Sequence, residues 1–188
     1  MARCYSDAMP PRHPLSKTWP LPKIWLISDA RNDAALEQAV KRLPRGSVLI
    51  FRHYHLDPVN RQARFKALQR LARQHGHHMV LSGSVAEARR WGADGAYGAN
   101  LAHGPALLRL VTVHSLRELR RAHRADAVLL SPVFPTRSHP GGKVLGPLRW
   151  RGIAALSPVP VIALGGMNAR RARQLQTSHW AGIDAFLR

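Results

Sequence analysis

The stretch 125–168 reads ADAVLLSPVFPTRSHPGGKVLGPLRWRGIAALSPVPVIALGGMN and contains two apolar runs, at 127–133 and 159–166, with a helical pattern at 149–156 between them. Each run is almost continuously apolar, whereas a strand with one solvent-exposed face would alternate apolar and polar residues. Such runs are typical of parallel strands covered on both faces. This stretch therefore predicts two parallel strands joined by a helix.

The same alternation continues outward to both ends of the chain. Eight strands alternating with helices favour a (β/α)8 barrel over an open, doubly wound sheet. The predicted fold class is thus α/β, a compact (β/α)8 TIM barrel. The other strands are expected at 23–29, 47–53, 78–83, 95–98, 110–115 and 181–186, and the other helices at 33–43, 59–76, 84–91, 116–123 and 168–177, with a shorter one near 105–109.

The sequence ends at Arg188, directly after the last predicted strand, so the last helix of the barrel is missing. We therefore expect either the N-terminal leader or a partner subunit, in a possible homo-oligomer, to cover that strand. At 188 residues the chain has room for one good core. Residues 1–22 contain five prolines and few periodic apolar positions, which predicts a disordered leader before a barrel domain at 23–188.

The formal charge of +19 raises nucleic acid or an anionic membrane surface as partners. However, the basic residues are scattered, and many fall on outer helix faces, which favours a solvated basic surface. The sequence has no nucleic-acid recognition motif, and its apolar runs are too short to span a membrane. We expect neither partner. The single Cys4 and the absence of a secretory pattern fit a cytoplasmic protein.

Barrels of this type bind ligands where the strands end at their carboxyl side. The side chains at those ends are therefore the first candidates for a site. They are Asp29, Arg52, His53, Ser82, Tyr97, His114, Ser131, Gly165 and Gly182.

The turn Gly165-Gly166-Met167-Asn168 follows an apolar strand and precedes a helix. Glycines there let backbone N–H groups approach an anion. A tight turn with Asn168 as the helix cap explains the same residues without a ligand. Together with Gly182 on the last strand, the turn matches the phosphate site that barrels build from strands seven and eight.

The loop leaving strand 127–133 is rich in hydroxyl groups, prolines and basic residues. Thr136 and Ser138 can donate to phosphate oxygens, and Arg137 or Lys143 can form charge-assisted hydrogen bonds. A proline-stiffened surface lid with solvated charges is the alternative interpretation.

His114 ends the fifth predicted strand and can act as a general acid or base, since imidazole titrates near neutral pH. A lone histidine is more often structural. The cluster of His75, His77 and His78 suggests a metal site, but with no carboxylate nearby we interpret it as exposed polar sequence.

The ordered motifs resemble the thiamine phosphate synthase and TenI superfamily over nearly all of the chain from Lys23. The set is specific because SPVFPTRS is followed by PVIALGGM at the right interval. The motifs are LISD (26–29), IFRHY (50–54), GADGAYG (92–98), VTVHS (111–115), ADAVLLSPVFPTRS (125–138), LGP (145–147), PVIALGGM (160–167) and WAGIDAF (180–186).

The resemblance implies an enzyme of thiamin biosynthesis that binds a small phosphorylated thiazole. Members either join a pyrimidine diphosphate to the thiazole phosphate, a transferase reaction, or isomerise the thiazole phosphate carboxylate. The resemblance also implies that the phosphate is bound by Thr136, Ser138, Gly166, Gly182 and Ile183. Our interpretation of the residues themselves adds Arg137 and Gly165 to this set.

The part of the site that holds the diphosphate matches less well. Where synthases have Q-L-R-E-K, this chain keeps Arg52 but has Tyr54 in place of the lysine, and the later family lysine is replaced by His139. The carboxylates that hold Mg²⁺ are replaced by Gly83 and Ala102. Mg²⁺ usually needs such carboxylates, so we expect no metal and no cofactor.

TenI-like members need no metal and use a histidine at the position of His114 for proton transfer. The residues therefore favour thiazole tautomerase chemistry, while the family as a whole favours the synthase label. A catalytically silent phosphate-ligand or regulatory barrel is the alternative.

Overall fold

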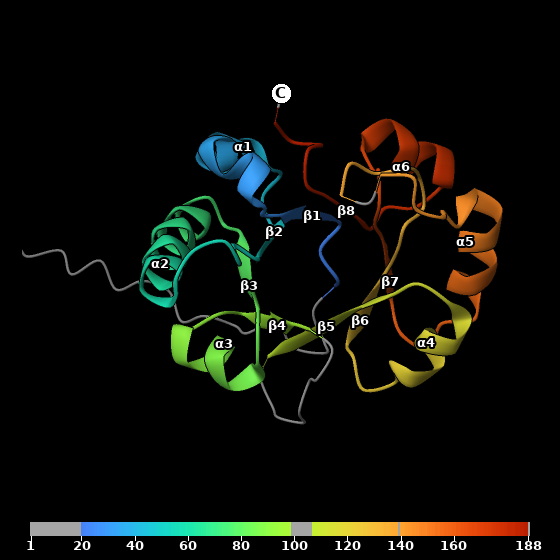
Figure 1. Cartoon of the computed structure of the whole chain (residues 1–188), viewed down its shortest axis with the longest axis horizontal. Coiled ribbons are helices and arrows are strands. Elements are labelled where there is room, and N and C mark those ends of the chain that lie inside the picture. The colour runs from blue at the N-terminus through green and yellow to red at the C-terminus, as the bar shows by residue number, and fades with distance from the viewer. Residues whose placement is uncertain (1–19, 99–106, 139, 188) are drawn as a thin grey trace, which may run out of the picture.

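The computed structural model describes residues 20–98, 107–138 and 140–187, in which eight parallel strands close into a barrel (Figure 1). Each strand pairs with its neighbours in sequence, and β1 pairs with β8 to complete the ring. This confirms the predicted (β/α)8 fold. The strands are β1 (Ile24–Ile27), β2 (Val48–Phe51), β3 (His78–Ser82), β4 (Gly95–Tyr97), β5 (Leu108–Val113), β6 (Ala127–Leu130), β7 (Val161–Ala163) and β8 (Trp180–Gly182).

The strands are apolar on both faces because alternate residues serve two different cores. Residues such as Trp25, Ile50 and Leu129 belong to one buried cluster that includes side chains from β1, β2, β3, β5, β6, β7 and β8. The intervening residues, such as Leu26 and Leu49, pack with the surrounding helices instead. Two-sided burial accounts for the unbroken apolar runs.

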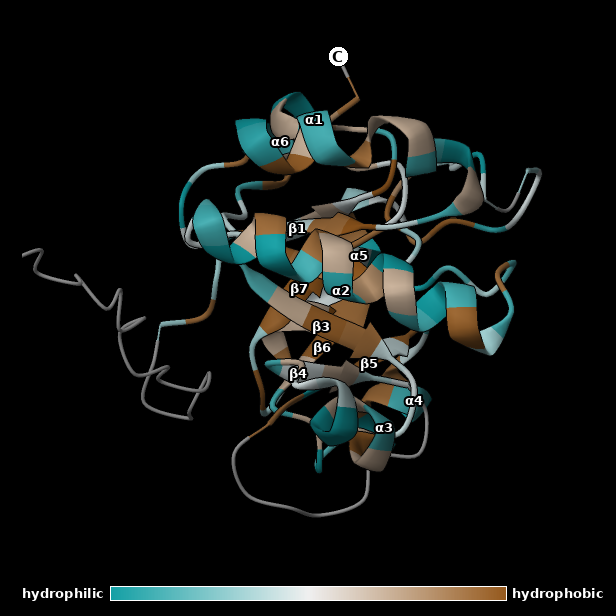
Figure 2. Cartoon of the chain, turned by 90° about the vertical axis from the view of Figure 1, so that its left-hand side faces the viewer, coloured by the Kyte–Doolittle hydropathy of each residue, from teal (hydrophilic) through white to brown (hydrophobic). Residues whose placement is uncertain are grey.

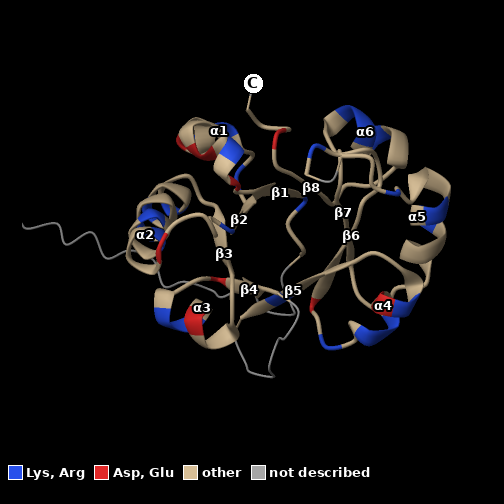
Figure 3. Cartoon of the chain, in the orientation of Figure 1, with Lys and Arg blue, Asp and Glu red and all other residues tan. Residues whose placement is uncertain are grey.

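The helices surround the strands and place their apolar sides against the barrel (Figure 2). One outer cluster packs α1, α2 and α3 on the barrel, and a second packs α4, α5 and α6. Lys and Arg are spread over the helices around the barrel (Figure 3). The helices are η1 (Ala30–Ala35, a 3-10 helix), α1 (Leu36–Arg42), α2 (Pro58–Gln74), α3 (Val85–Trp91), α4 (Leu116–Arg121), α5 (Gly146–Ala155) and α6 (Ala169–Leu175).

The short helix predicted near 105–109 is wrong at 108–109, because Leu108 and Arg109 begin β5 and pair with β4. Residues 105 and 106 lie outside the described residues. Helix α5 begins three residues before the predicted 149, since Pro147 can occupy a first-turn position without losing a hydrogen bond.

Within the described residues no helix follows β8. Instead, the ring of Phe186 stacks on that of Trp180 with centroids 5.0 Å apart. Trp180 is consequently only 6% exposed. Phe186 therefore covers Trp180 on the outer side of β8.

Most of the predicted leader, residues 1–19, lies outside the described residues. Leu21 packs against the cluster inside the barrel, and the carbonyl of Pro22 accepts a hydrogen bond from Trp25 Nε1 at 2.7 Å. The segment just before β1 thus contacts the amino-terminal end of the barrel. No helix in the described residues is long and apolar enough to cross a membrane.

Candidate functional site

A pocket of about 630 Å³ opens where the strands end at their carboxyl side. Of the strand-end candidates, Tyr97 and Ser131 line it, whereas Asp29, His53 and Ser82 do not. The nine residues predicted to act on the substrate or its phosphate all line the pocket, although they come from five different strand ends and the loops that follow. They are Arg52, His114, Thr136, Arg137, Ser138, Gly165, Gly166, Gly182 and Ile183.

The two glycines after β7 hold conformations that side chains rarely adopt, with φ of +96° at Gly165 and +60° at Gly166. A Cβ at Gly165 would lie 2.6 Å from the Cα of Pro132, and one at Gly166 would collide with the carbonyl of Pro135. The glycines are therefore needed for close packing against the loop after β6. In the described part of the chain, no hydrogen bond occupies their backbone N–H groups, which leaves both as donors.

The loop after β6 carries the hydroxyl groups of Thr136 and Ser138 beside this turn. Arg31, in η1 after β1, donates from Nη2 to Ser138 Oγ at 2.9 Å and pairs with Asp29 at 2.9 Å. Sequence analysis missed Arg31, since nothing in the spacing of residues 31 and 138 indicates the contact. A second basic residue that it missed, Arg171, lines the pocket and donates to the carbonyl of Gly166.

His114 lines the pocket with its ring fixed by the backbone. Its Nδ1 lies 2.8 Å from the carbonyl oxygen of Ser131. Because a carbonyl only accepts, Nδ1 carries the proton, and a neutral ring has its lone pair on Nε2. No described residue bonds to that nitrogen. His114 therefore presents a potential proton acceptor at the pocket.

The opposite wall of the pocket is aromatic and basic. The Arg52 guanidinium lies 5.6 Å from the centre of the Tyr54 ring, and among the described residues it forms no ion pair. The hydroxyl groups of Tyr97 and Thr112 are 2.5 Å apart. Burial raises the pKa of Tyr97, so its hydroxyl stays protonated at neutral pH.

The end of β3 is occupied by an ion pair and an aromatic ring. Arg61 donates to the carbonyl of Ser82 at 2.6 Å and to Glu87 Oε1 at 3.3 Å. The Tyr54 hydroxyl contacts that of Ser82. A Cβ at Gly83 would collide with Glu87 Oε2, so Glu87 fills the space beside that glycine. Ala102, at the other position where the family has a metal-binding carboxylate, lies outside the described residues.

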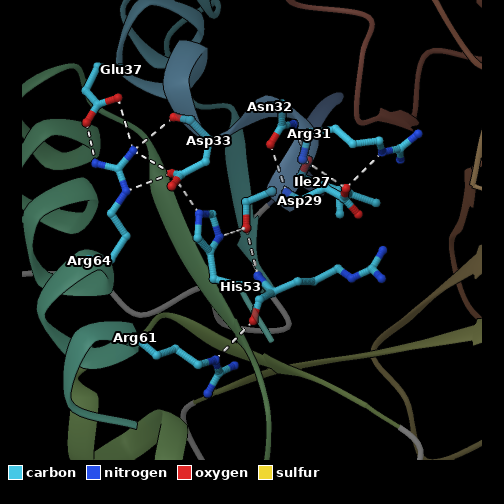
Figure 4. Close-up of polar contacts among 11 residues, drawn as sticks. Ile27, Asp29, Arg31, Asn32, Asp33, Glu37, His53, Arg61 and Arg64 are labelled. Atoms are coloured by element: carbon cyan, nitrogen blue, oxygen red, sulfur yellow. Dashed lines mark hydrogen bonds and ion pairs between the residues drawn. The ribbon is translucent and has the colours of Figure 1, made fainter. Parts of the chain in front are cut away.

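Next to Arg52, a hydrogen-bond network links the buried His53 to partly exposed charged groups on the neighbouring helices (Figure 4). His53 Nε2 lies 2.8 Å from Asp33 Oδ1, and Arg64 donates to the same oxygen at 2.7 Å. Burial lowers the pKa of His53. Burial would raise the pKa of Asp33, but the hydrogen bonds from His53 and Arg64 outweigh it and lower that pKa.

Asp33, His53 and His55 each offer a ligand atom, and these atoms lie within 4.8 Å of one another, as in a metal site. Arg64, however, donates from both Nε and Nη2 to Asp33 Oδ1. A guanidinium thus already occupies the carboxylate oxygen that a cation would need. We interpret the cluster as a hydrogen-bond network.

The other histidine cluster is not simply exposed, as we had expected. His77 is only 4% exposed, and its Nε2 bonds to the carbonyl of Val40 at 3.0 Å. The ring is buried because it packs between α1 and the start of β3.

Comparison with known proteins was made once this geometry was clear. A family model described as thiamine monophosphate synthase matches residues 24–186. A thiamine-phosphate synthase of Geobacillus thermodenitrificans is 26% identical over 99% of this chain and 88% of the relative. One of Pyrococcus furiosus is also 26% identical, over 87% of this chain and 83% of the relative.

Solved structures show the same fold. A thiamine phosphate pyrophosphorylase from Pyrococcus furiosus superposes with a TM-score of 0.72 at 24% identity, covering 86% of this chain and 85% of the other. FabK from Thermotoga maritima gives a TM-score of 0.64 at 17% identity, covering 88% of this chain and 58% of the other. At these identities the likeness extends to the barrel alone.

Proposed function

This chain belongs to the thiamine monophosphate synthase family of thiamin biosynthesis, and from that membership we propose that it binds a thiazole phosphate and moves a proton on it through His114. The reaction is a metal-independent tautomerisation of the thiazole phosphate carboxylate. The observation that carries the proposal is the His114 ring at a pocket that also contains the glycine turn. Ser131 holds the ring, and no described residue bonds to its Nε2.

The phosphate binds at the turn after β7 and the loop after β6. The free amides of Gly165 and Gly166 donate to its oxygens, and Thr136 and Ser138 add hydroxyl donors. Basic groups at this end, including Arg137 and Arg171, favour a dianion. Gly182 and Ile183 complete the wall from β8.

His114 acts as the base and then as the acid. Its Nε2 removes a proton from a carbon atom of the thiazole substrate. The resulting imidazolium then donates a proton to a second position on the same substrate. No atom is gained or lost apart from this exchange. The carbonyl of Ser131 keeps the ring oriented throughout, because it accepts from Nδ1 in both protonation states.

The end of β3 supports a reaction without metal. Mg²⁺ prefers hard oxygen ligands, usually including one or two carboxylates. In the described residues the carboxylate at this end is Glu87, which is paired with the Arg61 guanidinium. These groups do not fit a magnesium-diphosphate site, and no step is assigned to the metal.

Synthase activity is the second candidate, because two relatives at 26% identity are named thiamine-phosphate synthases. Parallel assays of the purified chain distinguish the two activities. One contains the thiazole phosphate carboxylate with EDTA, and the other contains thiazole phosphate, the pyrimidine diphosphate and Mg²⁺. We expect product in the first assay only, and product in the second assay alone would replace the tautomerase proposal by the synthase.

A third outcome, phosphate-ligand binding with neither product, would support the silent-barrel alternative. We further propose that the protein acts in the cytoplasm on this small substrate, with no nucleic-acid or membrane partner.

A further inference from the structure

The peptide of Arg52 is held from both sides where β2 reaches the pocket. Its N–H donates to Ser28 Oγ at 2.8 Å, and its carbonyl accepts from Arg61 Nε at 3.0 Å (Figure 4). The Arg52 side chain lines the pocket. The backbone from which the guanidinium reaches the ligand is therefore fixed before any ligand arrives.

The hydrogen bonds behind Arg52 have a defined direction. Ser28 Oγ accepts from Arg52, so its own hydroxyl proton is available for His53 Nδ1, 2.8 Å away. His53 Nδ1 then accepts this hydrogen bond. The Nε2 of the neutral ring carries the ring proton and donates a hydrogen bond to Asp33, 2.8 Å away. The series of bonds thus runs from the Arg52 amide through Ser28 and His53 to Asp33.

His53 is held firmly in an uncommon backbone conformation, with φ of +36°. Non-glycine residues in this region persist where their surroundings over-determine them, and they concentrate at functional sites. Here the ring is stacked on Phe51 at 4.5 Å with only 5° between the planes, and its side chain is fully buried. The surrounding packing therefore holds the His53 ring in place for its contacts with Ser28 and Asp33.

Asp33 is anchored in turn by helix α2. Arg64 bonds to Asp33 and also pairs with Glu37, which ties η1, α1 and α2 together behind β2. The Ser28–His53–Asp33 series has the same order of contacts as a hydrolytic triad. It cannot act on a substrate directly, because Ser28 is completely buried. Its effect on a ligand must pass through Arg52.

We propose that His53 is a positioning residue which, through Ser28, orients Arg52 to bind a second anionic group of the substrate, a carboxylate. The inference rests on the proposed function for the identity of that substrate. Arg52 suits the role because, among the described residues, its guanidinium forms no ion pair and a planar fork matches a carboxylate.

Two substitutions separate the contacts of His53. In His53→Asn, the amide oxygen takes the place of Nδ1 and still accepts from Ser28, while the contact with Asp33 is lost. In His53→Gln, the longer amide reaches Asp33 but leaves Ser28 without its acceptor. Asn also tolerates the left-handed backbone conformation well.

The first readout needs no ligand. Amide hydrogen exchange at Arg52, followed by NMR, should be slow in the wild type and in His53→Asn and at least about tenfold faster in His53→Gln. Equal exchange in His53→Gln and the wild type would overturn the positioning role. So would faster exchange in His53→Asn alone, which would show that Asp33 rather than Ser28 matters.

The second readout is a double-mutant cycle with Arg52→Gln, using binding of the thiazole phosphate carboxylate by calorimetry. His53→Gln should weaken binding about tenfold in the wild-type background and less than about twofold in Arg52→Gln, because both changes act on one interaction. Additive losses would contradict the proposal. Rescue of binding in His53→Asn would support it.

Inorganic phosphate serves as the control ligand, since it engages the glycine turn and the loop after β6 but not Arg52, and its affinity should not change in His53→Gln. If the wild type binds inorganic phosphate but not the thiazole phosphate carboxylate, the proposed function fails. The exchange experiment then still decides whether His53 positions Arg52.

Discussion

At the scale of single residues, His114 shows how one backbone contact defines a chemical group. The carbonyl of Ser131 selects the tautomer, and no described residue bonds to Nε2, the nitrogen that we propose acts on the substrate. Sequence analysis could identify His114 from its place at a strand end. It could not predict the tautomer, because Ser131 is 17 residues away on the next strand.

We predict that His114→Asn lowers turnover of the thiazole phosphate carboxylate by about 10² to 10⁴-fold, the usual range for general acid-base catalysis. Binding of inorganic phosphate should stay within about twofold, as the glycine turn is untouched. His123→Asn, at an exposed histidine outside the pocket, is the matched control. Steady-state kinetics and calorimetry measure both effects, and an unchanged turnover in His114→Asn would exclude the assigned role.

Gly165 allows a second prediction at this scale. Gly165→Ala should lower the free energy of unfolding by about 1–3 kcal/mol or more, because it combines a φ of +96° with a 2.6 Å contact to Pro132. Gly152→Ala is the control, since nothing lies within 4 Å of a Cβ there and the residue is inside helix α5. It should stabilise the protein by about 0.5–1 kcal/mol. Equal urea midpoints for the two variants would contradict this account.

At the scale of elements, the sequence pattern located all eight strands because two-sided burial makes most of their residues apolar. The last strand was predicted too long, at 181–186, since β8 ends at Gly182. The pattern was weakest near 105–109, where apolar residues entering β5 resemble a short helical segment. The His53 network could not be predicted at all. Asp33 lies 20 residues from His53 and 31 from Arg64, and the pairing of β1 with β2 and the packing of α1 against α2 bring them together.

The covering of β8 gives a prediction for an element. Phe186→Ala should destabilise the barrel by about 2 kcal/mol, less than the loss of a fully buried aromatic ring, because Phe186 is half-buried on Trp180. Leu148→Ala, at a side chain 84% exposed on α5, should change stability by less than about 0.5 kcal/mol. Thermal and urea unfolding compare them. A negligible effect of Phe186→Ala would mean that β8 is covered in another way.

At the scale of the whole molecule, buried histidines make stability depend on pH. Burial lowers the pKa of His53, His77 and His179 below the usual value of 6.5. The unfolded chain then binds more protons than the folded one as the pH falls through about 6.5, so stability is lost on acidification. A second loss follows below about pH 4, since the hydrogen bond from Arg64 lowers the pKa of Glu37.

Urea unfolding at a series of pH values tests this expectation. The free energy of unfolding should fall between about pH 7 and pH 5, and less steeply in His53→Asn, which removes one of these groups. A flat profile over this interval would show that the buried histidines titrate normally.

The whole barrel brings the glycine turn after β7 and His114 together in one pocket. The central proposal is that the turn binds phosphate and that His114 carries out tautomerisation without metal. Its most direct test is incubation of the purified chain with the thiazole phosphate carboxylate in D₂O containing EDTA, followed by proton NMR. The account predicts conversion between tautomers with deuterium incorporation, at a rate that the chelator does not change. Absence of conversion, together with thiamine phosphate formation from the pyrimidine diphosphate that requires Mg²⁺, would contradict it.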